Sequence, residues 1–311
     1  TGLTDKEDTM PNQQRAQHTH PTNRYILSPD ASFIRGLADC GFWKASLINS
    51  ALEHQLVGRF QRLAQRKQRL ISITPSIEAT LFLNKWHHIA IDDSQAKPTL
   101  TLYDRRGEPL YRLKSLEERD SAAHQALRQH LQRHADGHEP PSLRQRLPMR
   151  THPRAIETHA LQHAWQNLQQ PQDANQIFKA HAHNLNAVYH ALSPRFSRPI
   201  ALTHLPTIFE QCRRQALTLH LSARNPALVQ SYTGRIRKLL QLEQSLLIAD
   251  AGFKLQLKLD RIQQAWWLRT PSAQGTRYDL KLMDTFGQEV LSITNPIAQQ
   301  ACNAWIKLSE S

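Results

Sequence analysis

Histidines gather in one stretch of the chain, "DANQIFKAHAHNLNAVYHAL", which covers residues 173–192. At helical spacing, His181 falls on the same face as apolar residues, whereas Lys179, His183 and His190 share another face. Imidazole is the commonest metal ligand that titrates near neutral pH. The stretch could therefore present an imidazole and a cation to a ligand that carries a metal ion and acidic groups.

Each of these histidines also has a simpler interpretation. His181 could be a core residue with one satisfied hydrogen bond, and His183 and His190 could lie on a solvated helix face. His54, in "LEHQLVGRF", is a further candidate ligand. A histidine in a strand is more often structural than ligating, so both interpretations of His54 stay open.

Other metal-binding and catalytic patterns are missing from the sequence. His87 and His88 are adjacent in a predicted strand, so they should point to opposite sides and should not bind one metal together. Cys40, Cys212 and Cys302 are far apart and fit no zinc spacing, which favours buried, unreactive thiols. The chain also has no GxGxxG, Walker, HExxH or GxSxG motif.

Composition indicates a globular protein with an acidic partner. The chain has 311 residues, of which 40% are hydrophobic and 21% are charged. Its net charge of +13 favours nucleic acid, anionic lipid or a small ligand that carries carboxylates. No apolar run approaches the roughly 18 residues of a membrane span, and no signal pattern is present, so we expect a cytoplasmic protein without membrane insertion.

A repeat divides the sequence into two similar halves. "NSALEHQLVGRF" at residues 49–60 and "NPALVQSYTGRI" at residues 225–236 share Asn, Ala, Leu, Gly and Arg at the same places. With the same shift, "ATLFLNKW" at 79–86 falls on "LQLKLDRI" at 255–262, and both alternate as strands do. A repeated sequence of this kind predicts a repeated structural unit.

Hairpins and helices are predicted within each unit. "TLTLYDRRGEPL" at residues 99–110 falls on "DLKLMDTFGQEV" at 279–290, and in both an Asp is followed three residues later by a Gly, which predicts a tight turn between strands. Capping patterns and apolar periodicity predict helices that begin after Ser28 or Asp30 and that cover 115–134, 156–169, 173–192, 204–215 and 297–308.

Two polar segments separate these units. Residues 1–23 predict a disordered polar tail, and the basic, proline-bearing residues 134–154 predict a linker. The first repeat then covers residues 24–133 and the second covers residues 155–311. The expected fold is α+β, with two tandem structural repeats that are each a large antiparallel β-sheet flanked by helices.

Four segments resemble the haemin-degrading and haem-trafficking family of HemS/ChuX type, in its long, internally duplicated form: "GFWKASLINSALEHQLVGRF", "TLFLNKW", "NPALVQSYTGRI" and "AWWLRTPSAQGTRYDLKLMDTFGQEV". The resemblance runs from about residue 30 to residue 308, with both repeats in register. It implies a cytoplasmic protein with two large antiparallel sheets. Such a protein accepts imported haem and passes it on, or opens the macrocycle to release iron.

The resemblance also implies cofactors and partners. Haem needs burial of its apolar face, cations for two propionates and an axial donor for its iron. Degradation would require O₂ and an external reductant, because the chemistry belongs to the haem. A haem-import system or a downstream haem acceptor would be the protein partner. We expect binding and trafficking more than rapid turnover.

Several family pocket positions carry other residues in this chain. The resemblance places the axial histidine at Asn175 and a distal arginine at Thr80. The lysine of an Arg-Lys-Pro segment is Thr270, although Arg269 matches, and a family Tyr and Arg fall near Thr294. As substitutes we expect His181 and His183 at the haem iron, with His54, Arg269 and Lys179 as further haem-binding residues.

A family scaffold that has lost haem binding is the alternative. It would act as a basic nucleic-acid-binding or protein-interaction module. Basic clusters at residues 59–69, 143–150 and 235–239 could neutralise phosphates, although no known nucleic-acid-binding motif accompanies them. If haem is bound, we expect its pocket in the second half, around residues 173–192 and the sheet beyond them.

Overall fold

The computed structural model describes residues 24–27, 30–61, 63–72, 76–93, 97–135, 156–180, 185–273, 275–295 and 300–310. The predicted tail at residues 1–23 lies outside these ranges, and so does nearly all of the predicted linker at residues 134–154. His181 and His183 also lie outside the described residues.

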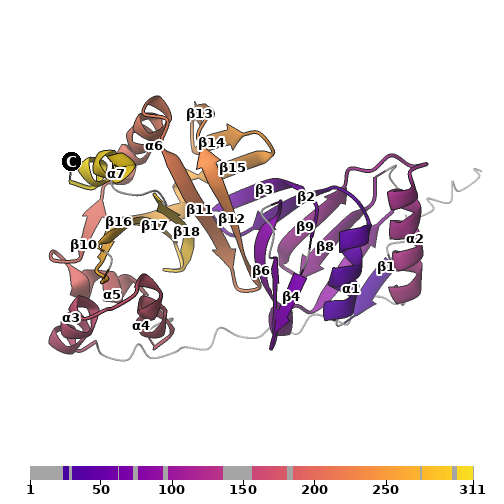
Figure 1. Ribbon diagram of the computed structural model, residues 1–311, viewed down its shortest axis with the longest axis horizontal. Coiled ribbons are helices and arrows are strands. Elements are labelled where there is room, and N and C mark those ends of the chain that lie inside the picture. Colours follow the sequence, from indigo (N-terminus) through magenta and orange to yellow (C-terminus); the bar gives the residue numbers. More distant parts are fainter. Residues whose placement is uncertain are drawn as a thin grey trace, which may run out of the picture.

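Two nine-stranded antiparallel sheets form the body of the molecule (Figure 1). Sheet A has the order β1 (Arg24–Leu27), β7 (His88–Asp92), β8 (Thr99–Tyr103), β9 (Pro109–Ser115), β2 (Trp43–Ile48), β3 (Leu52–Gly58), β15 (Phe253–Lys258), β14 (Ser245–Asp250) and β13 (Lys238–Leu242). Sheet B has the order β10 (Ser197–Ile200), β16 (Ile262–Thr270), β17 (Arg277–Asp284), β18 (Glu289–Thr294), β11 (Thr218–Asn225), β12 (Leu228–Arg235), β6 (Glu78–Phe82), β5 (Arg69–Ser72) and β4 (Leu63–Arg66). The predicted α+β class with two large antiparallel sheets is confirmed.

Helices flank both sheets. They are α1 (Ala31–Gly36), α2 (Ala122–His134), α3 (Thr158–Gln166), α4 (Ala174–Ala180), α5 (Leu185–Leu192), α6 (Leu205–Arg214) and α7 (Gln300–Glu310). Asp30 caps α1 by accepting a hydrogen bond from the Phe33 amide. The helix predicted from residue 115 begins later, because β9 runs to Ser115 and Ser121 is the N-cap. None of the described helices is long and apolar enough to cross a membrane.

Each sheet contains strands from both halves of the sequence. β13, β14 and β15 extend sheet A at β3, and β4, β5 and β6 extend sheet B at β12. Positions 176 residues apart make equivalent pairings, since Leu52 pairs with Leu257 and its counterpart Leu228 pairs with Leu81. Neither sheet is built from one half of the chain alone. The predicted division into repeats at residues 24–133 and 155–311 stays a prediction.

A pair of asparagines explains why the repeat keeps its opening residue. Asn49 Oδ1 accepts hydrogen bonds from the amides of Ala51 and Leu52, at 3.0 and 2.9 Å, and Asn225 makes the same bonds in its own turn. Asn49 Nδ2 donates to the Arg224 carbonyl at 2.8 Å, and Asn225 Nδ2 donates to the Ile48 carbonyl at 2.9 Å. Each side chain thus fixes its own hairpin and joins it to the other half.

A buried polar group links the two sheets between these asparagines. Gln230 and His54 are counterparts in the repeat, and neither is exposed to solvent. Gln230 Nε2 donates to the His54 carbonyl at 2.8 Å, and Gln230 Oε1 accepts from the Tyr111 hydroxyl at 2.8 Å. Burial lowers the pKa of His54 to about 3, so its ring is neutral at neutral pH. His54 is therefore a core residue in this structure.

The repeated Asp and Gly residues form the predicted hairpin turns. Asp104 Oδ1 accepts from the amides two and four residues later, and Asp284 Oδ1 does the same. Gly107 and Gly287 have φ values of 80° and 71°, a region that residues with a side chain rarely adopt. Both turns are confirmed, between β8 and β9 and between β17 and β18.

The described cysteine side chains behave as small apolar residues. Cys40 and Cys212 are buried, and burial raises the pKa of Cys40 to about 11 and that of Cys212 to about 12. A thiol with so high a pKa is a poor nucleophile at neutral pH. The prediction of buried, unreactive thiols is confirmed for these two residues, and the Cys302 side chain lies outside the description.

Replacement of Asn49 should weaken the whole fold. Asn49→Ala removes two turn hydrogen bonds and the two bonds to carbonyls of the other half, so the free energy of unfolding should fall by about 2 to 4 kcal/mol. Urea denaturation measures this change. Asn84→Ala, at an exposed position, is the control and should cost less than about 0.5 kcal/mol. Equal effects would contradict the linking role of Asn49.

His54 should make the protein sensitive to acid. Below about pH 6.5 the unfolded chain binds a proton at this histidine, whereas the folded chain binds it only near pH 3. This site should therefore remove about 2 to 3 kcal/mol of unfolding free energy between pH 7.5 and pH 4.5. His54→Gln, which copies its counterpart Gln230, should show a correspondingly smaller loss. Equal losses in both proteins would argue against a buried neutral His54.

Candidate functional site

Helices α3, α4 and α5 cover one end of sheet B (Figure 1). Their apolar residues pack on β16 and β17, where the rings of Tyr189 and Trp266 have centroids 6.0 Å apart. Trp165 Nε1 also donates to the Arg269 carbonyl at 2.9 Å, which fixes α3 to β16. The cluster consists of Leu161, Trp165, Ala174, Leu185, Val188, Tyr189, Leu192, Phe196, Trp266, Leu268 and Met283.

Polar side chains continue this face of sheet B beyond the helices. From Trp266 the row of directly paired residues runs through Lys281, Ser292, Ser222 and Ser231. Lys281 Nζ donates to Ser292 Oγ at 2.8 Å, and Ser231 Oγ donates to Ser222 Oγ at 3.2 Å. We call this surface the polar face of sheet B. It comprises Glu78, Thr80, His220, Ser222, Arg224, Val229, Ser231, Thr233, Asp279, Lys281, Glu289, Ser292 and Thr294.

Strand alternation produces the polar face. In β11, Leu219 and Leu221 are buried in the core, so His220 and Ser222 project from the opposite side. His220 lies across from Thr294 on one side and Thr233 on the other. The sequence analysis did not single out His220, although this alternation is visible in "TLHLSARN".

His220 is held by one hydrogen bond. Its Nδ1 lies 2.9 Å from Thr233 Oγ1, and its Nε2 has no hydrogen-bond partner among the described residues. The residue is half-buried. The ring is therefore fixed at one nitrogen while the other is available to a ligand.

An ionic network anchors α5 beside this surface. Glu289 Oε2 accepts from the Tyr189 hydroxyl at 2.9 Å and lies 3.6 Å from Lys281 Nζ, while its Oε1 lies 3.4 Å from Arg224 Nε. Burial opposes ionisation of Glu289, but Arg224 and Lys281 outweigh it, so the pKa of Glu289 lies below its usual value. Burial, and then Glu289, raise the pKa of Tyr189 well above its usual value. Glu289 is thus a buried carboxylate between two cations.

Arg224 is the exposed part of this network. Its side chain is 42% exposed, whereas that of Glu289 is 3% exposed. Neither Arg224 Nε nor Glu289 Oε1 makes a hydrogen bond to another described residue, although the two atoms face each other. The guanidinium can therefore accept a further anionic partner at the surface.

Those predicted haem-binding residues that the structure describes are not brought together. Lys179 and Asn175 are exposed on α4. Arg269 points away from the polar face of sheet B, with its guanidinium 5.8 Å from the centroid of the Tyr278 ring. His54 lies in the core. The roles predicted for His181 and His183 concern residues outside the described ranges and stay predictions.

The threonines at family pocket positions do share a surface. Thr294 lies across from His220, and Thr80 lies across from Val229 on the same side of sheet B. Thr270 is buried beneath the helices, and its Oγ1 has no hydrogen-bond partner in the described part of the chain. Short hydroxyl side chains thus occupy three places on one side of the sheet.

The prediction for His87 and His88 is wrong in its geometry. Their Nδ1 atoms lie 3.0 Å apart, because β7 begins at His88 and His87 precedes the alternating strand. The ring of His88 stacks on Tyr103, with centroids 5.0 Å apart. Two imidazoles are a small ligand set, and no group of three or more His, Cys, Asp or Glu residues in the described ranges could hold a metal ion.

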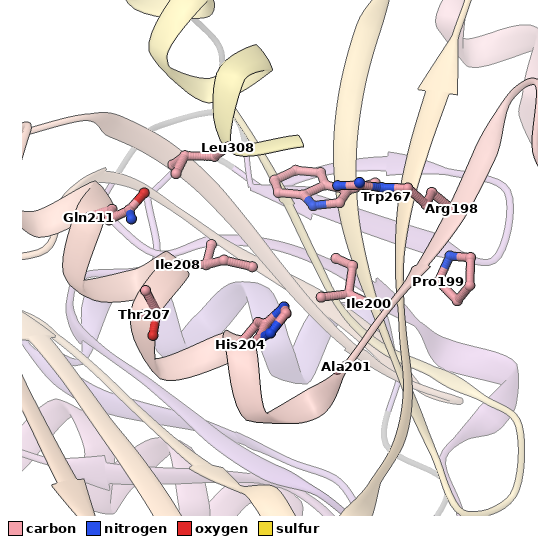
Figure 2. A pocket seen from close by; sticks show the side chains of 10 residues that line it. All are labelled: Arg198, Pro199, Ile200, Ala201, His204, Thr207, Ile208, Gln211, Trp267 and Leu308. Carbon is pink, nitrogen blue, oxygen red and sulfur yellow. The ribbon is translucent and has the colours of Figure 1, made fainter. Parts of the chain in front are cut away.

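A cleft lies on the opposite side of sheet B (Figure 2). This cleft of about 340 Å³ is bounded by β10, β16, α6 and α7. Figure 2 shows Ile200 and Ile208 directed toward one another, with His204 at the rim. Trp267 lines the cleft but is only 2% exposed, and it packs against Trp305 at 4.7 Å. The cleft is therefore lined by both apolar and polar side chains.

The described basic clusters do not form one surface. Residues 63–66 and 69 belong to β4 and β5 at an edge of sheet B, whereas Lys238 and Leu239 begin β13 at an edge of sheet A. Arg237 is paired with Asp250, with 2.7 Å between Nε and Oδ1. The cluster at residues 143–150 lies outside the described residues.

Comparison with known proteins identifies both the fold and a domain. The family model "Haemin-degrading HemS.ChuX domain" matches residues 182–311. Holo-PhuS, a heme-binding protein from Pseudomonas aeruginosa, is similar with a TM-score of 0.82 at 18% identity, over 93% of this chain and 86% of PhuS. ChuS, an Escherichia coli heme oxygenase, is similar with a TM-score of 0.80 at 18% identity, over 94% of this chain and 90% of ChuS. No match was found among curated proteins.

The domain match covers α5, α6, β10 to β18 and α7, which include most of the polar face of sheet B. The structural similarity extends to the strands that the first half contributes. Residues 182–311 therefore match the haemin-degrading HemS/ChuX domain model, and the chain as a whole has the fold of PhuS and ChuS.

Proposed function

We propose that the protein binds haem on the polar face of sheet B and passes it on or supports its degradation to release iron. The observation that carries the proposal is a half-buried imidazole, His220, beside an exposed cation on the sheet of a HemS/ChuX domain. PhuS is described as a heme-binding protein and ChuS as a heme oxygenase, which supports haem as the ligand.

The side chains of this surface match the chemistry of haem. Aromatic residues stand at one border, where Tyr189 packs near Trp266. Ser222 and Ser231 are short, so they leave room for a flat macrocycle above the central strands. Arg224 offers a guanidinium to a propionate, and charge-assisted bonds of this kind are among the stronger polar contacts.

Binding and trafficking suit these residues better than rapid turnover. Bound haem supplies the redox chemistry of its own degradation, which consumes O₂ and electrons from an external reductant. The polar face contributes binding and orientation. Asn175 stands at the family's axial position and is exposed, so that position offers no imidazole to the iron. A haem importer or a downstream acceptor would then be the functional partner.

A bulky residue on the polar face should block haem binding. Thr80→Trp places an indole on this surface, whereas Gln256→Trp makes the same change at the repeat counterpart on sheet A. Both positions are half-buried. In titrations of the purified chain with ferric haemin, followed by the Soret band, wild type and Gln256→Trp should bind one haem alike. Thr80→Trp should bind at least about tenfold more weakly, a loss of about 1.4 kcal/mol.

Two outcomes would contradict the proposed function. The first is a featureless titration equal to that of an unrelated basic protein. The second is equal weakening in both tryptophan variants, which would place the ligand elsewhere. Salt provides a further check, because haem affinity that depends on burial and ligation should change little between about 50 and 200 mM salt, whereas phosphate binding would fall by orders of magnitude.

A further inference from the structure

We infer that His220 is a ligand of the haem iron, so that the iron is held from strand β11 of the sheet. This inference rests on the proposed haem site, and it assigns to the strand a role that the sequence analysis placed on the stretch at residues 173–192. The position, the orientation and the neighbours of the imidazole support it.

His220 lies on a central strand of sheet B, in the outermost transverse row of the polar face. β11 lies between β18 and β12, so strands cover both of its edges. In its transverse row, His220 stands between Thr294 and Thr233, and Ser222 follows on the same side of β11. These three side chains are shorter than an imidazole. The His220 ring therefore rises above its neighbours, where a flat ligand that covers the strands would meet it first.

The hydrogen bond to Thr233 orients the ring for ligation. When Nδ1–H donates to Thr233 Oγ1, 2.9 Å away, Nε2 is unprotonated and carries a free lone pair. Histidines that bind metals almost always use their second nitrogen in such a bond, which fixes the tautomer and the ring plane. Thr233 is thus a positioning residue for this imidazole.

The nearby charges do not compete for the imidazole. Asp279 lies beyond Thr294 in the same row and is paired with Arg277, at 3.0 Å between Oδ2 and Nη2. Glu289 is engaged by Tyr189 and by two cations, as described above. These two carboxylates are therefore neutralised by other partners. A third acidic residue of the polar face, Glu78, lies across from Ser231 and outside the row of His220, so His220 keeps its nitrogen for a ligand.

Other described histidines near sheet B are placed less well. His190, on α5, packs edge-on against Trp266 at the border of the polar face, with 4.7 Å between the ring centroids. His204 lies at the rim of the cleft on the opposite side of the sheet. Among the residues that the structure describes, His220 is the histidine that belongs to the polar face. His181 and His183 lie outside the described ranges and are the competing ligands in the test below.

The test is a ferric haemin titration of the full chain, read by optical absorption and electron paramagnetic resonance. His220→Ala should shift the Soret band, lose the signature of iron bound to imidazole, and weaken haem binding about tenfold or more. Added imidazole should restore the wild-type spectrum. The matched control is His204→Ala, which removes an exposed histidine on the opposite side of the sheet and should leave spectrum and affinity unchanged.

A milder variant guards against a folding defect in His220→Ala. Thr233→Val keeps the size of the exposed Thr233 and keeps His220, but removes the hydrogen bond to Nδ1. It should shift the iron spectrum in the same direction as His220→Ala, with a weakening of about threefold to tenfold. Circular dichroism and the melting temperature should stay near those of wild type, because the change is at the surface.

The outcomes separate this inference from the proposed function. If wild type binds one haem and His181→Ala or His183→Ala alters the iron spectrum while His220→Ala does not, the ligand lies outside the sheet and the inference is wrong, although the haem site stands. If wild type shows no saturable binding, the proposed function fails and the inference fails with it. A spectral shift in both His220→Ala and Thr233→Val supports both.

Discussion

The exchange of strands between the two halves is the constraint on which the rest of this structure depends. Without it, β3 and β12 would be open edges, and an open edge is a site of unwanted pairing. Each half covers the other's edge with three strands. Asn49 and Asn225 stabilise the place where the two halves meet. Each side chain accepts hydrogen bonds from the amides of its own turn and donates to a backbone carbonyl of the opposite half. The sequence repeat is retained where this reciprocal bonding requires it.

The exchange also decides how the polar face of sheet B is built. β6 comes from the first half and lies beside β12 of the second, so Thr80 shares a surface with His220 although the two are far apart in sequence. The match to the haemin-degrading domain begins at residue 182 and does not include β6. The matched domain therefore needs the first half of the chain to complete this surface.

Local patterns predicted the strands, turns and most helices, but not the partners of the strands. Alternation tells which residues share a side, and an Asp with a Gly three residues later marks a turn, whereas nothing local tells that β15 pairs with β3.

The two strand histidines show both the strength and the limit of this reasoning. His54 lies on the same side of its strand as Leu52 and Leu56 and is buried with them. His220 lies on the side of its strand opposite to Leu219 and Leu221, outside the core. The alternation of each strand therefore distinguishes the core histidine from the surface histidine, whereas the number of histidines in the chain does not.

Charge is a poor guide to the site in this chain. The net charge of +13 suggested an acidic ligand, yet Asp279 and Glu289 of the polar face are paired with cations, and the exposed cation of the Glu289 network is Arg224. A surface so nearly neutralised attracts a dianionic ligand weakly at long range, since exposed charges are screened within about 10 Å at 0.1 M salt. Affinity for haem would then come from burial of the macrocycle and from ligation of its iron. Ligation of the iron would then depend on a single imidazole, that of His220, whose ring is oriented by the hydroxyl of Thr233.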